Sequence, residues 1–148
     1  MADNNPDIIN DIKKGLSDIN SKISDLNGEI SKKEKACESL VAFKRQVVAT
    51  QENFNGLTGS QNSHLNSLLS SSDDCHSAKV YSEGMNKTLT SFGTRIVGLA
   101  LVGFIAKIDF RIGLYKTEIA AAKSTIGQLS NQIDHMQSEM ERLLGQGD

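Results

Sequence analysis

The chain has 148 residues and a formal net charge of −2, with 38% hydrophobic residues, 5% aromatic residues, no Trp and a single Pro. This composition is too poor in large apolar side chains for a wide globular core, but it is sufficient for a narrow seam between helices. Sparse aromatics and one proline also argue against a β-sandwich or barrel, which needs many turns and bulky strand residues. The length fits one domain.

The charge balance argues against nucleic-acid partners, and the lengths of the apolar runs argue against membrane insertion. Proteins that bind polyanions usually carry a strongly basic footprint, which a net charge of −2 does not provide. The longest apolar run, Ile96 to Ala106, is shorter than the roughly 20 residues that span a bilayer. The polar opening of the chain lacks the apolar core of a signal peptide. We therefore expect a protein made in the cytosol, without stable membrane insertion and not exported by the general secretory route.

The first predicted helix covers about residues 7–52. It opens at Pro6-Asp7, because proline is tolerated in the first turn of a helix. Apolar residues then recur at alternating spacings of four and three, which keeps them on one side of a helix, as in a coiled coil. These residues are Ile12, Leu16, Ile19, Ile23, Leu26 and Ile30, and the same frame continues to Lys33, Cys37 and Leu40.

A polar break with a short helix is predicted at residues 53–75. Turn-forming residues crowd its beginning, where Phe54-Asn55-Gly56 is interpreted as a helix terminus, with Gly56 in the left-handed conformation and Phe54 over the end of the core. The alternative is an aromatic-x-Gly turn like the one at the bend of small secreted helical hairpins. Ser72 or an adjacent aspartate is a good N-cap for the next helix.

The last predicted helix covers about residues 76–144 and carries the clearest pattern in the chain. Its apolar positions alternate strictly between spacings of three and four, without a polar interruption. At about 1.5 Å per residue this stretch is roughly 57 Å long, which predicts an elongated molecule. The twelve positions are Ile105, Ile108, Ile112, Tyr115, Ile119, Ala122, Ile126, Leu129, Ile133, Met136, Met140 and Leu143.

A partner-binding face is predicted near the start of this helix. Residues 98–104 are apolar on nearly every side, and such a helix must be buried on several sides. One partner helix covers only one stripe, so we expect a third helix, either from the middle of this chain or from another protein. The predicted face consists of Tyr81, Met85, Leu89, Phe92, Ile96, Leu99, Val102 and Phe104.

The two long seams are expected to fold against each other. The predicted fold is an all-α, elongated, antiparallel helical hairpin or coiled coil with a short central helix, forming a single domain over residues 1–148. His64, His76 and His135 are far apart in sequence, and the pair Cys75-His76 does not complete a zinc site. Phosphate-binding glycine loops and nucleophile motifs are also missing. We expect no catalytic, metal or cofactor site, and no enzymatic activity.

The layout resembles a family of small helper proteins, the YwqH-like proteins, which are encoded beside LXG toxins of bacterial type VII secretion. Leu16 to Leu40 match the N-terminal coiled-coil helix of that family, residues 77–81 match its helix restart, and Ile105 to Leu143 match its long last helix. Relatives often carry a Trp-x-Gly-like motif before the restart, where this chain has Asp74-Cys75-His76.

The resemblance implies a targeting chaperone without catalytic activity. Such helpers bind the helical N-terminal LXG region of a toxin, alongside a second small WXG-like protein, and support its export through type VII secretion. The alternative is a structural coiled coil that assembles with itself into a homo-oligomer, as in a phage or surface filament. An amphipathic membrane binder would need Lys and Arg along one polar face, whereas the last helix mixes both charge signs.

Overall fold

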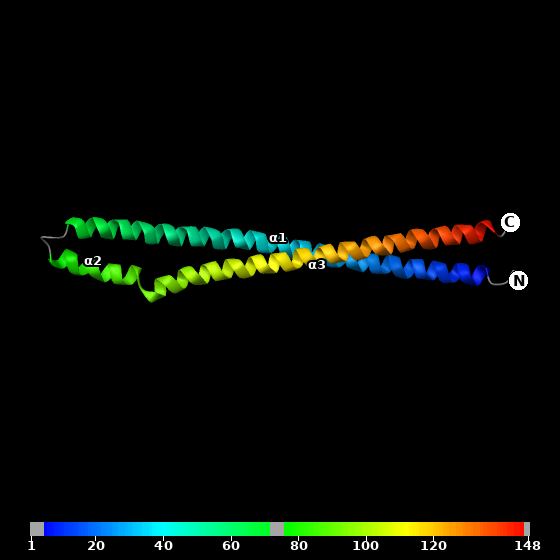
Figure 1. Cartoon of the computed structure of the whole chain (residues 1–148), viewed down its shortest axis with the longest axis horizontal. Coiled ribbons are helices and arrows are strands. Elements are labelled where there is room, and N and C mark those ends of the chain that lie inside the picture. Colours follow the sequence, from blue (N-terminus) through cyan, green and yellow to red (C-terminus); the bar gives the residue numbers. More distant parts are fainter. Residues whose placement is uncertain (1–4, 72–75, 147–148) are drawn as a thin grey trace. The chain divides into compact units, whose positions relative to one another are not determined.

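A computed structural model describes residues 5–71 and 76–146, and it contains three helices. These are α1 (Asn5–Ser71), α2 (His76–Leu89) and α3 (Phe92–Gly145), and the described residues form no strand (Figure 1). The predicted all-α helical hairpin is confirmed. The chain divides into two compact units, one made of Met1–Glu38 with Gly113–Asp148 and the other of Ser39–Ile112. The single domain over residues 1–148 stays a prediction.

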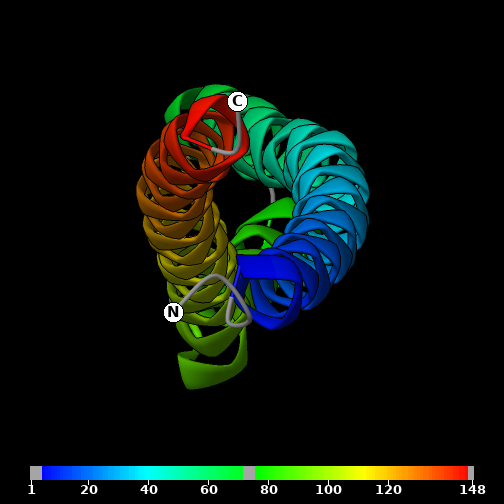
Figure 2. The same cartoon turned by 90° about the vertical axis from the view of Figure 1, so that its right-hand side faces the viewer.

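In the first unit, the N-terminal half of α1 lies beside the C-terminal half of α3, and the two run in opposite directions (Figures 1 and 2). The predicted heptad positions are the ones withdrawn from solvent. Ile19 and Ile30 are less than a tenth exposed, and the buried thiol of Cys37 is on the same stripe. On α3, the predicted positions from Tyr115 to Leu143 are half-buried. The heptad pattern therefore identified both seams of this unit correctly.

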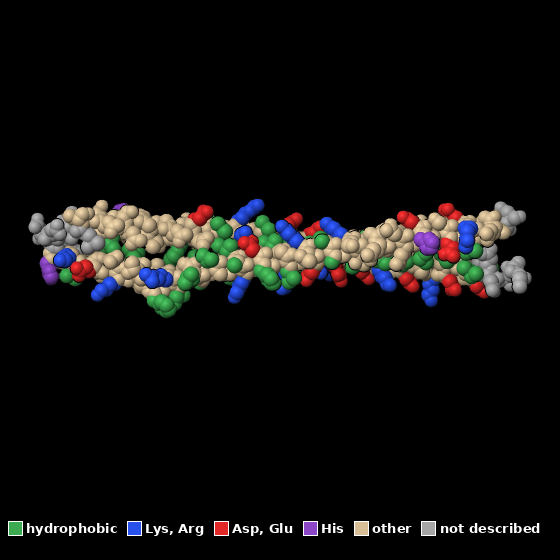
Figure 3. All heavy atoms as spheres, in the orientation of Figure 1, with side chains coloured by type: hydrophobic (Ala, Val, Ile, Leu, Met, Phe, Trp, Pro, Cys, Tyr) green, Lys and Arg blue, Asp and Glu red, His purple; other side chains and the backbone are tan. Residues whose placement is uncertain are grey.

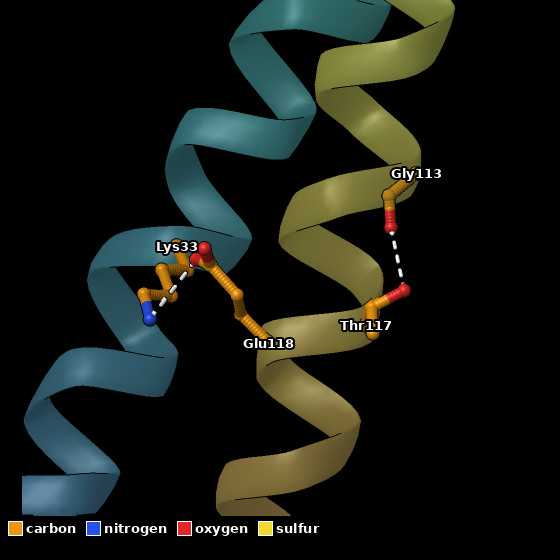
Figure 4. A network of polar contacts seen from close by, with 4 residues as sticks. All are labelled: Lys33, Gly113, Thr117 and Glu118. Carbon is orange, nitrogen blue, oxygen red and sulfur yellow. Dashed lines mark hydrogen bonds and ion pairs between the residues drawn. The ribbon is translucent and has the colours of Figure 1, made fainter.

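Polar side chains flank the seam of the first unit. Lys33 Nζ lies 3.1 Å from Glu118 Oε2, and Lys123 Nζ lies 3.2 Å from Glu34 Oε1. Figure 4 shows the first pair, together with the 3.0 Å hydrogen bond that Thr117 Oγ1 donates to the carbonyl oxygen of Gly113. Lys33 occupies a predicted seam position, and its long stem allows its ammonium to reach a carboxylate at the rim.

The second unit contains the rest of α1, all of α2 and the first turns of α3. Its most buried apolar side chains are Val47, Leu65, Ile108 and Ile112. Contacts between α1 and α3 set their pairing. The rings of Phe43 and Phe104 meet edge to face with centroids 5.8 Å apart, and Lys44 Nζ lies 2.6 Å from Asp109 Oδ1.

The predicted end of the first helix at residue 52 is wrong, because α1 continues to Ser71. Phe54 and Gly56 lie inside this helix, and none of the described glycines has a positive φ. The side chain of Thr58 donates a 2.8 Å hydrogen bond to the carbonyl oxygen of Phe54, as expected within a helix. The predicted turn motif is therefore a segment of continuous helix.

Tertiary packing explains why α1 continues through a sequence rich in turn formers. Its covered side extends at helical spacing from Val47 to Leu65, but several of the positions between them are polar. The ring of Phe54 lies 3.8 Å from the place where Gly98 would carry a Cβ, so α3 packs against this part of α1. The covered residues are Val47, Gln51, Phe54, Thr58, Asn62 and Leu65. The proposed N-cap at Ser72 lies outside the described residues.

The predicted long helix over residues 76–144 is also wrong in one respect, because it is interrupted between α2 and α3. Ser91 is the N-cap of α3: its Oγ accepts a 3.4 Å hydrogen bond from the amide of Thr94. The Thr94 hydroxyl in turn donates to the carbonyl oxygen of Thr88 at 3.1 Å, across the junction. Capping supplies a partner for an amide that the first turn of a helix leaves unsatisfied. Gly93 and the neighbouring threonines further weaken the helix here.

Candidate partner-binding face

In the second unit, the first half of α3 has one apolar side that is covered by α1. We call this side the inner seam, and it consists of Leu101, Ile105, Ile108 and Ile112. Ile108 is 5% exposed and Ile112 is 8% exposed. Ile105, Ile108 and Ile112 belong to the stripe that the heptad pattern predicted, and Leu101 continues it towards the N-terminus of α3.

The opposite side of the same helix segment is also apolar, and no described segment of the second unit covers it. Phe92, Leu99 and Phe110 are 79%, 72% and 74% exposed. Together with three smaller or less exposed residues they recur at spacings of 4, 3, 4, 3 and 4. With 3.6 residues per turn, these positions fall within an arc of roughly 80°, centred roughly 170° from the inner seam. We call them the outer stripe: Phe92, Ile96, Leu99, Gly103, Ala106 and Phe110.

Figure 3 shows hydrophobic side chains gathered on the surface over the first turns of α3. Single exposed apolar residues are common on protein surfaces, whereas a continuous exposed apolar stripe marks a site of interaction. The outer stripe is continuous over five helical turns. It is therefore the strongest candidate for a binding site in the second unit.

The eight residues of the predicted partner-binding face do not share one surface. Phe92, Ile96 and Leu99 belong to the outer stripe, and Val102, which is 55% exposed, lies at its edge. The other four lie elsewhere: Tyr81 and Met85 line a shallow hollow with Leu65 and Leu68 of α1, Leu89 is half-buried, and Phe104 packs on Phe43.

Sequence reasoning missed Phe110, although it is one of the most exposed aromatic side chains. The regular isoleucine spacing of the inner seam predicted a different set of heptad positions on this helix, and Phe110 is not one of them. Continuing the frame of Phe92, Ile96 and Leu99 by the same spacings passes through Gly103 and Ala106 and reaches Phe110. The two small residues concealed this continuation.

Gly103 lies in open space among the described residues. A Cβ at this position would meet no atom within 4 Å, whereas a Cβ at Gly98 would contact the ring of Phe54. Glycine in a helix interior costs about 1 kcal/mol relative to alanine. Gly56 and Gly127 are equally open, so the open space at Gly103 does not by itself indicate a partner; it shows that the outer stripe has room for a close approach at this position.

The two edges of the outer stripe carry different charged residues. Arg95 and Asp109 lie on one edge, separated by almost four helical turns, and Asp109 also pairs with Lys44 of α1. On the other edge, Lys107 is accompanied by the small residues Gly93 and Ala100. One edge of the outer stripe therefore carries a positive charge near its N-terminal end and a negative charge near its C-terminal end.

The described polar side chains form no comparable site. Within residues 5–71 and 76–146, no three His, Cys, Asp or Glu side chains lie close enough to hold a metal ion. Of the pair noted in the sequence, Cys75 lies outside the described residues. No helix in the part of the chain that the structure describes is long and apolar enough to cross a membrane.

No protein-family model, no curated protein and no solved structure matches this chain.

Proposed function

We propose that this protein is a helper without catalytic activity that binds a helical partner, namely the LXG region of a type VII secretion toxin, and supports its export. The observation that carries the proposal is the outer stripe of α3. It presents apolar side chains at the spacing at which one helix packs against another, on a helix that already packs against α1 through its other side.

The driving force would be burial of the outer stripe. Removing apolar surface from water stabilises a complex by about 25 cal/mol per Å². Phe92, Leu99 and Phe110 are all more than seven-tenths exposed, so most of their apolar surface is still available for a partner. An amphipathic helix that places its own apolar positions between these side chains is the complementary ligand.

The class of partner comes from the resemblance of the chain to helpers encoded beside LXG toxins. In this proposal the toxin contributes a helix to the outer stripe, and a second small WXG-like protein completes the complex. The helper acts in the cytosol, where it keeps the apolar helices of the toxin covered until export. Type VII secretion would then be its route out of the cell, if it accompanies its cargo.

Co-expression with the LXG region of the toxin encoded next to this chain tests the proposal. We expect the two polypeptides to co-purify as a stable complex. Leu99→Glu places a charge in the middle of the outer stripe and should abolish co-purification. Gln128→Glu adds the same charge at an exposed position of α3 in the first unit, and this control should retain the complex. The proposal fails if the wild-type chain never co-purifies, or if Leu99→Glu binds as well as the wild type.

A further inference from the structure

The outer stripe has the same spacing when it is read in either direction along α3. Its intervals of 4, 3, 4, 3 and 4 residues are symmetric about residue 101. Its side chains are not symmetric: the bulky Ile96 and Leu99 lie before the centre, and the small Gly103 and Ala106 lie after it. A stripe of this kind is complementary to a reversed copy of itself.

We propose that a second copy of this chain covers the outer stripe, with the two α3 helices antiparallel about a two-fold axis near residue 101. In this register Leu99 faces Gly103 of the second copy and Ile96 faces its Ala106. At each end, Phe92 faces Phe110 of the second copy. Every layer next to the axis combines one bulky and one small residue, which is the combination that fills space evenly. The proposal goes beyond the proposed function and does not rest on it.

Other registers pack poorly. A parallel pair would place Gly103 against Gly103 and Ala106 against Ala106, and cavities between small residues are costly. An antiparallel pair shifted by one heptad towards the C-terminus would place Ala106 against Gly103 and Phe92 against Thr117, and a shift in the other direction would leave Ala106 and Phe110 beyond the start of α3 of the second copy. Only the register centred on residue 101 matches all six positions of the outer stripe.

The charged border of the outer stripe supports the same register. In an antiparallel helix pair, the residues that flank the seam on one edge face residues of the same edge on the other helix. Arg95 is therefore placed near Asp109 of the second copy, and the symmetry repeats this pair of opposite charges. On the axis, Val102 meets Val102, which accounts for its 55% exposure in the single chain. On the other edge, Ala100 meets Ala100, so the helices can approach closely.

The two-fold arrangement closes on itself. Both copies use the same surface, so pairing consumes the outer stripe and produces a dimer instead of a filament. A helix of another protein would need the same surface. Any partner of the outer stripe must therefore displace the second copy, and self-association lowers the apparent affinity for that partner by mass action.

Crosslinking of single-cysteine variants tests the pairing and its register. The background carries Cys37→Ala and Cys75→Ser, and this background chain without a new cysteine is the control. With a short bismaleimide, Val102→Cys should crosslink to itself. Phe92→Cys alone should not, because its counterpart lies at the far end of the stripe. A mixture of the Phe92→Cys and Phe110→Cys chains should crosslink. Efficient crosslinking of Phe92→Cys alone would indicate a parallel pair and overturn the proposal.

Light scattering of the full chain, with a matched pair of glycine variants, provides the second test. We expect the wild type to have the mass of a dimer. Gly103→Leu should remain helical by circular dichroism but be a monomer at concentrations where the wild type is a dimer. Gly127→Leu is the control, because Gly127 also lies in α3 with open space around its missing Cβ, and this variant should stay dimeric.

The outcomes separate this proposal from the proposed function. A wild-type chain that is monomeric at all concentrations, or a dimeric Gly103→Leu variant, overturns pairing with a second copy. If the chain is a monomer and binds the LXG region, pairing with a second copy is refuted and the proposed function is supported. A dimer with the expected crosslinks that never binds the LXG region would support the pairing and refute the toxin as partner.

Discussion

Truncation of two nearby residues of α3 should change the stability of the chain by very different amounts. Ile108 belongs to the inner seam and is 5% exposed, whereas Phe110 belongs to the outer stripe and is 74% exposed. We expect Ile108→Ala to lower the free energy of unfolding strongly. Phe110→Ala removes a larger side chain, yet it should leave the free energy of unfolding of the single chain almost unchanged.

The expected magnitude follows from burial. Ile108→Ala removes three carbon atoms from a buried side chain, and at about 0.8 kcal/mol for each buried carbon the loss is roughly 2.4 kcal/mol. A cavity raises the cost of such substitutions in closed cores, where Ile→Ala typically costs about 2–5 kcal/mol. A seam between two helices can close or admit water more easily, so we expect a loss of about 2–3 kcal/mol. For Phe110→Ala, the expected change lies within about 0.5 kcal/mol, as for ordinary surface substitutions.

Urea denaturation followed by circular dichroism measures both values. The chain should be diluted until the unfolding midpoint no longer depends on protein concentration, so that association does not contribute. In the same preparations, light scattering should show that Phe110→Ala weakens self-association. Equal destabilisation by the two substitutions at this dilution would refute the assignment of an inner seam and an outer stripe.

Three further substitutions test the helices themselves. Gly56→Ala should stabilise the chain by about 1 kcal/mol in urea denaturation, because Gly56 lies in a helix interior with open space around it; destabilisation would indicate the turn that the sequence suggested. Ser91→Ala should destabilise by about 1 kcal/mol because α3 loses its N-cap, and Ser91→Asn should restore most of the loss in the same assay. A double-mutant cycle on Lys44 and Asp109 should give a coupling of about 0.2–1 kcal/mol that decreases with added salt; a coupling unaffected by salt would contradict a partly exposed ion pair.

Much of the fold could be predicted from the sequence. The seams of the first unit consist of apolar residues at nearly every heptad position, and this spacing indicates a helix whatever its surroundings. The positions from Tyr115 to Leu143 are accordingly on the covered side of α3. The end of α1 was misjudged because Gln51, Thr58 and Asn62 occupy its covered side between Val47 and Leu65. Polar residues there hide the periodicity, and only the packing against α2 and α3 shows that the helix continues.

For the candidate site too, some features could be predicted from the sequence and others could not. By itself, the sequence determined that the chain is helical, where its main seams lie, and that the start of the last helix is too apolar for a single partner. Only the tertiary structure decided which apolar side of α3 faces α1, and therefore that Phe104 contacts Phe43 and is 46% exposed, whereas Phe110 is 74% exposed. The physical reason is that periodicity places residues on the sides of a helix, whereas a side becomes an interior or a surface only when another helix covers it or leaves it open.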